Sequence, residues 1–464
     1  MIRSTPDEEN VQRPSFQENA NWAAYGLDPI MATMSNVNPD AEAQTNTEDA
    51  PGQDVEKSFS AWLCVLGSFL ALVPTFGFMN SLGTVQSYLS INQLQNYSEG
   101  EVGWISGVFL FLSLIFNVQV GPMVDVHGPN IIGPVGAVLY VAMFLLMAEC
   151  SEYWHFMLCL GVFGSIGAAM TMVVAIAVVG KLFVRKRGLA MGITLAGSSV
   201  GAVIFPLILR STYPNLGWQW SMRIMAFISA GLLLPSMICF IPFNKLYKNS
   251  TVAGGQASPK SSTLNFTAFK SPAFCFVTGG IFMFEFVIFS ISGLLPSIST
   301  RVGFTPENGF TLLAIIGSTS TLGRIIPGII GDKYGHFNIL LIMAVFTIIF
   351  MGALLVPFGT KSAAALYAWS ALWGFGSGSF LSITPVCMGK TCEAKDYGRY
   401  YGMMNFVTAF ALLIALPSSG AMLENMGPQA LAGLFTALTA VGGACNVAAR
   451  ALLIGKWLSP KTIV

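Results

Sequence analysis

The amino-acid sequence predicts an all-α membrane protein in which twelve transmembrane helices form two six-helix pseudo-repeats. Of the 464 residues, 54% are hydrophobic and only 10% are charged, whereas soluble domains carry about 25% charged residues. Twelve apolar segments follow the first 57 residues, and each is long enough to cross a bilayer as a helix. The spacing Gly-x-x-x-Asp-x-x-Gly occurs twice, 207 residues apart, which indicates a duplicated chain.

The apolar segments are each about 19 to 25 residues long. Because every backbone N–H and C=O group must be satisfied inside lipid, continuous segments of this length predict helices rather than barrel strands. The expected spans cover residues 61–81, 101–121, 131–149, 156–180, 189–209, 220–241, 273–296, 309–330, 338–357, 364–387, 401–421 and 432–454.

Residues 1–57 hold half of the 22 acidic residues and are rich in Asn, Gln, Pro and Ser. Such a segment buries too little apolar surface to fold alone, so we expect a disordered acidic cytosolic tail. No apolar signal region precedes the first span, so no cleaved signal peptide is expected. The rest divides into an N-terminal half at 58–241, a cytosolic central loop at 242–271 and a C-terminal half at 272–464.

Lysine and arginine mark the cytosolic side of a membrane protein. With both termini inside, four of the 23 basic residues face outward and one, Arg324, lies within the membrane. The reverse orientation would place the basic cluster at residues 181–187 outside. We therefore expect a multi-pass protein with cytosolic termini in the plasma membrane; a vacuolar or other internal membrane is the alternative.

The repeated spacing falls in the loops after the second and eighth spans. Glycine permits two helices to approach closely, and an aspartate can cap the N-terminus of a neighbouring helix. One copy alone is compatible with an ordinary tight turn, but two copies at equivalent places predict a pair of conformational-switch loops. The first copy consists of Gly121, Asp125 and Gly128, and the second of Gly328, Asp332 and Gly335.

Two charged residues lie deep within predicted spans. Arg324 precedes the end of its span by about eight residues, which places it roughly 12 Å inside the membrane. An arginine there costs about 2.5–3.5 kcal/mol on insertion scales and needs a partner or a function. Glu285 lies about 13 residues into the seventh span among aromatic residues, where a carboxylic acid could carry a proton. A duplicated chain with a buried cation indicates a transporter.

We expect Glu285 and Arg324 to face one central cavity, either paired with each other or bound in turn to solute and proton. The alternative is a structural ion pair that joins spans seven and eight. Asn80 and Asn117 are further polar positions that contact solute or serve helix packing. Asn96 begins the sequence Asn-Tyr-Ser in the first outer loop and is the predicted glycosylation site.

Several classes of protein are excluded by composition. The eight cysteines and three histidines are scattered singly, so we expect no metal site and no cofactor. No basic cluster is dense enough for nucleic acid. No nucleophile lies beside a base in a pattern typical of an enzyme.

The two loops resemble the signature of the major facilitator superfamily, because they stand where that superfamily carries Gly-x-x-x-Asp-x-x-Gly. The resemblance implies parallel six-helix repeats, solute binding between them near the membrane midplane, and loops that act in the inward–outward switch. In the first copy, Pro129 and Asn130 replace the basic residues usual after the last glycine.

Within that superfamily, residues 183–201 resemble the start of span five in the monocarboxylate porter family. An aromatic residue, a basic triplet, Leu-Ala, Gly and Ala-Gly-Ser occur in that order, although Gly-x-x-x-Gly also serves close helix packing. Arg324 resembles the span-eight arginine that faces the carboxylate of the solute, to which a guanidinium forks two hydrogen bonds. The span-five residues are Arg185, Arg187, Gly192, Gly197, Ser198 and Gly201.

The chain departs from the family pattern at three places. Before span one it keeps the acid, Glu56, and Trp62 but not the two glycines. Asn80 replaces the lysine of proton-coupled lactate carriers, and Ser320 replaces the acid one turn before the span-eight arginine. The long acidic tail and short central loop resemble the fungal branch, whose members take up carboxylates or riboflavin or accompany secondary-metabolite pathways.

We therefore expect a secondary active transporter of a small organic, carboxylate-bearing solute that works by alternating access. It is expected to act as a monomer in the lipid bilayer, by symport or antiport, with a proton as the candidate coupling ion. The first alternative is an exporter of a fungal secondary metabolite without coupling of the proton–lactate type. The second is a nutrient sensor that has kept the fold but lost transport.

Overall fold

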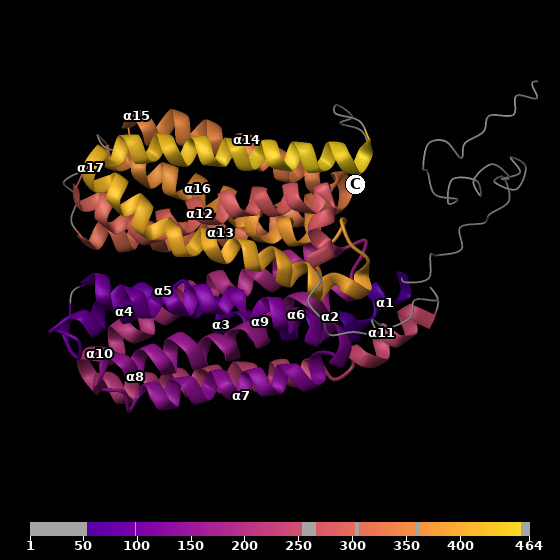
Figure 1. Ribbon diagram of the computed structural model, residues 1–464, viewed down its shortest axis with the longest axis horizontal. Helices are drawn as coiled ribbons and strands as arrows, with labels where there is room; N and C mark the ends of the chain where they lie inside the picture. The colour runs from indigo at the N-terminus through magenta and orange to yellow at the C-terminus, as the bar shows by residue number, and fades with distance from the viewer. Residues whose placement is uncertain (1–52, 98, 253–265, 302–305, 359–361, 456–464) are drawn as a thin grey trace, which may run out of the picture. The chain divides into compact units, whose positions relative to one another are not determined.

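Every regular element in the described part of the chain is helical (Figure 1). The computed structural model describes residues 53–97, 99–252, 266–301, 306–358 and 362–455. Most of the predicted tail, the middle of the central loop and the last nine residues lie outside these ranges. The predicted all-α class is confirmed.

The N-terminal half contains ten α-helices and one π-helical turn within the described residues. Short helices flank the first span, and the second and fourth spans are each built from consecutive helical pieces. The elements are α1 (Gln53–Lys57), α2 (Phe59–Leu72), α3 (Thr75–Met79), α4 (Leu82–Ile91), α5 (Glu99–Ile115), α6 (Asn117–His127), α7 (Pro129–Met147), α8 (Tyr153–Phe156), a π-helix (Met157–Gly164), α9 (Ser165–Leu182) and α10 (Arg187–Cys239).

The C-terminal half repeats this plan after a short connecting helix, α11 (Phe243–Val252), and a 3₁₀ turn (Phe266–Lys270). Its elements are α12 (Pro272–Arg301), α13 (Pro306–Tyr334), α14 (His336–Phe350), a π-helix (Met351–Leu355), α15 (Val356–Phe358), α16 (Ala363–Met388), a 3₁₀ turn (Ala394–Asp396) and α17 (Tyr397–Ile454).

Two of these helices each cover two predicted spans. α10 is interrupted at Gly217 (φ 72°) and α17 at Gly427 (φ 84°), both with positive φ angles that favour glycine. Nine described helices are long and apolar enough to cross a membrane, and these two long helices are among them. α16, with 26 residues, covers the tenth predicted span but is not one of the nine. All twelve predicted ranges are thus largely helical, and the count of twelve membrane crossings stays a prediction.

Two segments differ from the expected domain division. α1 lies inside the range predicted as tail, and α11 lies inside the range predicted as central loop. α1 forms because Glu56 finds backbone partners in the loop before α10, as described below. Apolar residues recur along α11 at helical spacing, so one face of the helix is apolar, and the helix packs against α2 and α9.

Each half is held by extensive contacts between its own helices, and the halves meet mainly along two helix pairs. In the N-terminal half α2 packs along α10 and α7 along α9; in the C-terminal half α12 packs along α17 and α13 along α16. Between the halves, α10 packs against α13, and α6 packs against α17 (Figure 1). These two pairs are called here the α10–α13 interface and the α6–α17 interface.

Glycine allows both interfaces to close to backbone contact. A Cβ atom built on Gly121 would lie less than 3.0 Å from the Gly398 carbonyl, and one on Gly328 equally close to the Gly188 carbonyl. A side chain at either glycine would force the helices apart.

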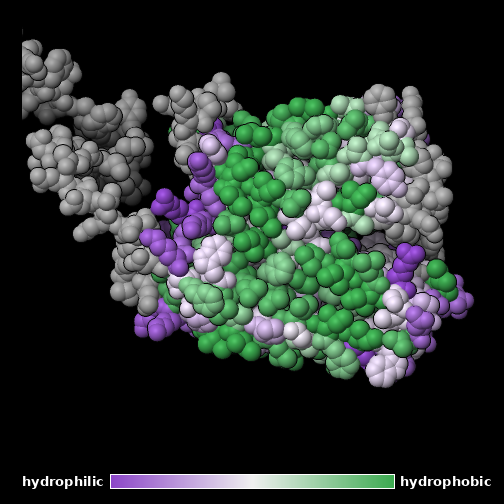
Figure 2. All heavy atoms as spheres, turned by 180° about the vertical axis from the view of Figure 1, so that it is seen from behind, coloured by the Kyte–Doolittle hydropathy of each residue, from purple (hydrophilic) through white to green (hydrophobic). Residues whose placement is uncertain are grey.

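The described surface carries the pattern expected of a protein surrounded by lipid. In Figure 2, hydrophobic side chains cover the middle of the visible face, and hydrophilic ones gather toward two opposite ends. Large apolar side chains are freely exposed, such as Leu234 (66%) and Ile238 (63%) in α10. A contiguous exposed apolar surface of this kind marks contact with a membrane or a partner.

Candidate functional site

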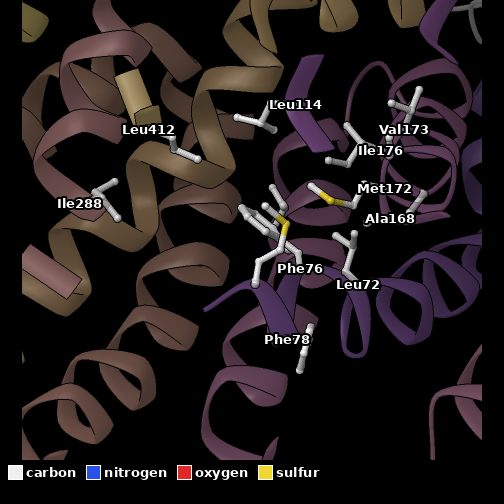
Figure 3. Close-up of a cluster of buried hydrophobic side chains, with 14 of the residues drawn as sticks. Leu72, Phe76, Phe78, Leu114, Ala168, Met172, Val173, Ile176, Ile288 and Leu412 are labelled. Carbon is white, nitrogen blue, oxygen red and sulfur yellow. The ribbon is translucent and has the colours of Figure 1, made fainter. Parts of the chain in front are cut away.

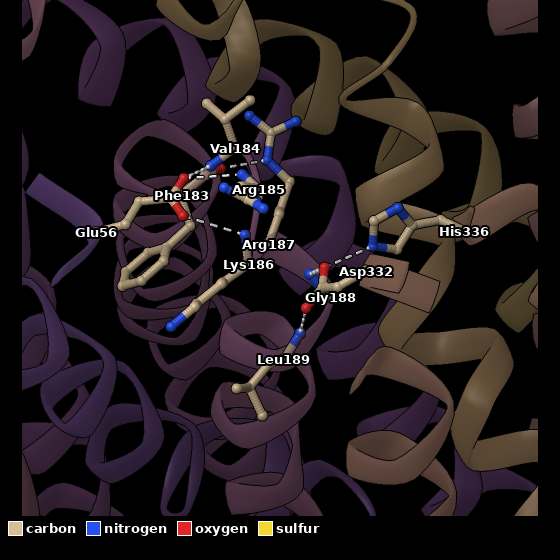
Figure 4. A network of polar contacts seen from close by, with 10 residues as sticks. All are labelled: Glu56, Phe183, Val184, Arg185, Lys186, Arg187, Gly188, Leu189, Asp332 and His336. Carbon is tan, nitrogen blue, oxygen red and sulfur yellow. Dashed lines mark hydrogen bonds and ion pairs between the residues drawn. The ribbon is translucent and has the colours of Figure 1, made fainter. Parts of the chain in front are cut away.

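Asp332 caps the N-terminus of α10. This residue lies near the end of α13, and its Oδ1 accepts a hydrogen bond from the Gly188 backbone N–H at 2.7 Å while Oδ2 accepts one from Leu189 at 2.8 Å (Figure 4). The first N–H groups of a helix have no acceptor within it. The negative charge also interacts favourably with the helix dipole. A C-terminal carboxylate therefore holds an N-terminal helix.

Asp125 makes the reciprocal contact. From the end of α6, its Oδ1 accepts a hydrogen bond from the Gly398 N–H at 3.1 Å and its Oδ2 one from Arg399 at 2.8 Å. Gly398 and Arg399 stand in the first turn of α17. The two loops predicted as switches thus bridge the halves in opposite directions at the same end of the bundle.

The two capping aspartates have different side-chain partners. Lys181 Nζ lies 2.7 Å from Asp125 Oδ1, and both side chains are almost fully buried. Asp332 Oδ1 instead lies 2.9 Å from His336 Nε2, one turn further along the chain. The last glycines of the motifs, Gly128 (φ 79°) and Gly335 (φ 92°), have positive φ angles and precede the next helix in each half.

The basic residues of the span-five motif lie at the same end. Arg187 is buried; its Nε donates to the Phe183 carbonyl and its Nη2 to the Gly180 carbonyl, both at 2.7 Å. Its guanidinium also lies 5.6 Å from the centre of the Tyr397 ring, at the start of α17. Arg187 therefore connects the halves, whereas the Arg185 side chain is exposed.

Glu56 joins this network and was not among the predicted site residues. Its Oε1 accepts hydrogen bonds from the backbone N–H groups of Val184 (2.6 Å) and Arg185 (2.8 Å), and Oε2 accepts one from Lys186 at 3.2 Å (Figure 4). Trp62 donates from Nε1 to the Glu56 carbonyl at 3.0 Å. The acid retained before span one was the available signal.

The glycines of the span-five motif serve close packing. A Cβ atom on Gly197 or Gly201 would lie less than 3.0 Å from the carbonyls of Phe69 and Val73, respectively, in span one. One on Gly192 would lie equally close to the Arg324 carbonyl. Gly192 thus serves the α10–α13 interface, and the other two hold α10 against the first span.

Arg324 is buried in the α10–α13 interface, with 4% of its surface exposed. Its Nη1 donates to the Leu195 carbonyl and to Ser198 Oγ, both on α10. Its Nε has no hydrogen-bond partner within the described part of the chain. The side chain therefore crosses from one half to the other and keeps a donor free.

Asn117 occupies the place of Arg324 in the other interface. The two residues stand 207 positions apart, the same offset that relates the two aspartates. Asn117 is fully buried in α6, and a Cβ atom on Gly402 of α17 would lie less than 3.0 Å from its carbonyl. Among the described residues, neither its Oδ1 nor its Nδ2 has a hydrogen-bond partner.

Glu285 is placed with α17 rather than with Arg324. It is buried in α12, with 8% exposed, and it lies close to Thr408 of α17. No ion pair joins it to Arg324, and its Oε2 has no partner, over the residues that the structure describes. The structure thus does not form the ion pair that was one of the sequence expectations.

Three polar residues of α17 complete this region and were missed by the sequence analysis. Tyr401, Asn405 and Thr408 follow one another at helical spacing and are all buried. Tyr401 lies near Asn405 and Glu285. Polar residues at positions i, i+4 and i+7 in an apolar span were the available signal. We call Asn117, Glu285, Tyr401, Asn405 and Thr408 the α6–α12–α17 cluster.

Apolar side chains of both halves lie next to this cluster. Leu114, Ile288 and Leu412 are buried, and they stand one helical turn from Asn117, Glu285 and Thr408, respectively. Figure 3 shows these three in one hydrophobic group with side chains of the N-terminal half, namely Leu72, Phe76, Phe78, Ala168, Met172, Val173 and Ile176. The cluster therefore borders an apolar region between the halves.

The remaining predicted residues lie away from the two interfaces. Asn80 is exposed at the end of α3, and its Nδ2 donates to the Phe76 carbonyl at 2.9 Å. Asn96 is exposed in the turn after α4, next to Ser98, which lies outside the described residues. A solute contact at Asn80 and glycosylation at Asn96 stay predictions.

Duplicated helical halves, an apolar belt and buried polar residues between the halves define a membrane transporter. The chain belongs to the Major Facilitator Superfamily, whose family model matches residues 59–416 and 328–462. The superfamily fold predicted from the sequence is thereby confirmed.

Curated relatives cover most of the chain. The riboflavin transporter MCH5 of Saccharomyces cerevisiae is 30% identical over 98% of this chain and 94% of its own length. The aspyridones efflux protein apdF of Emericella nidulans is 31% identical over 82% of this chain and 76% of its own length.

A solved structure shares the fold. The human organic anion transporter MFSD10 (TETRAN) superposes with a TM-score of 0.62 at 15% identity, covering 83% of this chain and 98% of that one. At this identity the likeness bears on the fold alone.

Proposed function

We propose that the protein is a secondary active transporter of a small organic solute with a carboxylate group, and that Arg324 binds this group. The observation that carries the proposal is the buried guanidinium between the halves, whose Nε has no partner among the described residues. A guanidinium binds a carboxylate through two parallel hydrogen bonds, which a lysine cannot reproduce. An arginine at this depth is costly unless it has a function.

Alternating access follows from the two interfaces. In this structure, the caps made by Asp125 and Asp332 hold the α6–α17 and α10–α13 interfaces together at one end of the bundle. For solute to leave at that end, both helix pairs must separate and the four N–H groups must exchange the carboxylates for water. We propose that the two motifs act as this switch, and that this end is cytosolic.

Glu285 is the proposed carrier of a coupling proton. Its Oε2 has no partner within the described chain, and it lies beside Tyr401 and Thr408. Glu285→Gln should abolish transport driven by a pH gradient while the protein still reaches the membrane. Glu152→Gln, at an exposed site in the loop before α8, is the matched control. Normal coupling in Glu285→Gln would remove this residue from the mechanism.

Membership of the fungal branch of the monocarboxylate porter family is also proposed. It is supported by the span-five motif and by the contact between Trp62 and Phe183, whose ring centres lie 5.3 Å apart. Glu56, Trp62 and Phe183 are all residues on which the resemblance rests, and they meet in one network. We also propose that the protein acts as a monomer in the plasma membrane, with both termini in the cytosol.

Export of a secondary metabolite is the second candidate. It is favoured by a relative named as an aspyridones efflux protein and by Asn80 and Ser320, which replace the lysine and acid of lactate carriers. The relative named as a riboflavin transporter favours a bulky solute in either direction.

One experiment tests the function and its direction together. Metabolites are compared without prior selection, in cytosol and medium separately, between cells that lack the protein and cells that carry it. Accumulation of a compound inside the deletion cells marks an exporter, and a compound left in their medium marks an importer. An unchanged distribution of every acidic metabolite would contradict transport of a carboxylate.

A further inference from the structure

The α6–α12–α17 cluster contains buried polar atoms that the proposed role of Arg324 does not use. Within the part of the chain that the structure describes, Asn117 Oδ1, Asn117 Nδ2, Asn405 Nδ2 and Glu285 Oε2 have no hydrogen-bond partner. Their residues are at least 92% buried, since Glu285 is the most exposed at 8%. Native proteins seldom leave buried amides unpaired, so these atoms require water or a ligand.

The duplication explains why these atoms lack partners. In the α10–α13 interface, Arg324 reaches the Leu195 carbonyl and Ser198 Oγ. In the α6–α17 interface, Asn117 takes the place of Arg324. On α17, Asn405 corresponds to Leu195 and Thr408 to Ser198, each 210 positions further along the chain. Because asparagine is several atoms shorter than arginine, it does not reach across. Asn117 Oδ1, Asn117 Nδ2 and Asn405 Nδ2 therefore lack partners at the places that correspond to the Arg324 contacts in the other interface.

We infer that Asn117 and Asn405 bind a cyclic amide, a lactam or imide ring edge, of the transported solute. A carboxamide presents an N–H donor beside a C=O acceptor, and a cis-amide edge in a ring presents the complementary pair. A second carboxylate offers only acceptors, so it would leave Asn117 Oδ1 without a donor. The inference rests on the proposed function, which assigns the acidic group of the solute to Arg324.

Apolar side chains lie next to the polar cluster. Leu114, Ile288 and Leu412 lie one helical turn away and are buried in the hydrophobic group of Figure 3. A solute that places its polar edge on the two asparagines would lay its apolar body against these side chains. Binding sites for small molecules combine apolar walls with a few placed polar groups in this way.

The test uses the full-length protein in lipid nanodiscs and two neutral probes. 2-Pyridone carries the amide edge, and N-methyl-2-pyridone differs only in that its donor is blocked. Binding is measured by saturation-transfer NMR. The wild-type protein should bind 2-pyridone about tenfold more tightly than the N-methyl compound, the effect of one or two hydrogen bonds. Equal binding of the two probes, or binding of neither, overturns the inference.

Variants locate the site. Asn117→Leu removes the acceptor of the ring N–H, which only 2-pyridone carries, so it should bring the ratio of the two affinities to below about twofold. Asn405→Leu removes the donor to the ring C=O, which both probes carry, so it should weaken the binding of both probes. Asn405→Asp keeps the size of the side chain and removes the same donor, so it should weaken both probes about tenfold even if the leucine variants fold poorly. The control is Asn425→Leu, at an exposed asparagine that bonds only its own helix within the described residues. Unchanged affinity for both probes in folded Asn405→Asp, or an unchanged ratio in folded Asn117→Leu, overturns the assignment.

A second probe pair separates this inference from the proposed function. Benzoate should bind about tenfold more tightly than benzyl alcohol, and Arg324→Gln should remove that preference while the pyridone ratio persists. Loss of carboxylate preference in the wild type, with the pyridone ratio intact, would contradict the proposed function and support the amide subsite. The reverse result would contradict the amide subsite alone.

Discussion

Asp125 and Asp332 cap helices of opposite halves. Asp125, in the N-terminal half, accepts hydrogen bonds from the first turn of α17, and Asp332, in the C-terminal half, accepts them from the first turn of α10. Each half is therefore fastened to the other at the same end. A conformational change that separates only one interface would still leave the second cap in place, so both caps must open together.

The first prediction concerns these caps. Asp332→Ala should speed amide hydrogen exchange at Gly188 and Leu189, because their N–H groups lose their acceptors; loss of a cap costs about 0.5–2 kcal/mol. Exchange at Ala365, whose N–H donates to Ser362 Oγ in the first turn of α16, serves as the internal control. Mass spectrometry of exchanged peptides measures both sites. Equal rates at residues 188–189 in variant and wild type would show that Asp332 does not cap α10.

The two aspartates should differ in their effect on stability. Asp125→Asn leaves Lys181 charged and buried without its partner, a change that costs about 3–5 kcal/mol. Asp332→Asn leaves no buried lysine unpaired, because the side-chain partner of Asp332 is His336, so this change should cost less. Thermal unfolding of the purified variants measures the difference. Combining Lys181→Met with Asp125→Asn should recover most of the loss, and equal melting of the two single variants would contradict this account.

Glu56 should fix the loop between spans four and five. Glu56→Ala removes the acceptor of three backbone N–H groups, so we expect faster proteolysis at residues 184–186 and a lower melting temperature. The expected loss in the free energy of unfolding is about 1 kcal/mol, the usual effect of losing a helix cap. Glu149→Ala, which removes a partly exposed ion pair with Arg223, is the control. Unchanged cleavage would mean that α1 is held by other contacts.

The sequence predicted the fold because its main signals are long-range and redundant. Apolar length specified the helices, and two copies of one motif specified the duplicated halves. The capping role of Asp125 and Asp332 also followed from helix electrostatics. α10 and α17 each contain two predicted spans. The spans could still be told apart in the sequence, because Gly217 and Gly427 each lie between two apolar segments.

The site could be predicted only in part. Arg324, Glu285 and Asn117 stand out because polar groups are costly in lipid. Their partners do not, because Leu195 contributes only a backbone carbonyl. Glu56 was marked by its place before span one, but its backbone partners at residues 184–186 are set by the fold of that loop. Asn405 and Thr408 gain significance from their place opposite Asn117, which depends on how α6 and α17 meet. Such relationships arise from packing and are invisible in a linear pattern.

The central claim is that Arg324 binds the carboxylate of the solute. The direct measurement is transport of the compound found by metabolite comparison, in proteoliposomes that contain wild type, Arg324→Lys or the control Arg223→Lys. Arg223 is partly exposed and forms an ion pair with Glu149, away from the two interfaces. Lysine keeps the charge but loses the paired hydrogen bonds. We predict that Arg324→Lys transports at least tenfold less at low solute concentration while the control matches wild type. Wild-type transport by Arg324→Lys, or an identified solute without an acidic group, would contradict the claim.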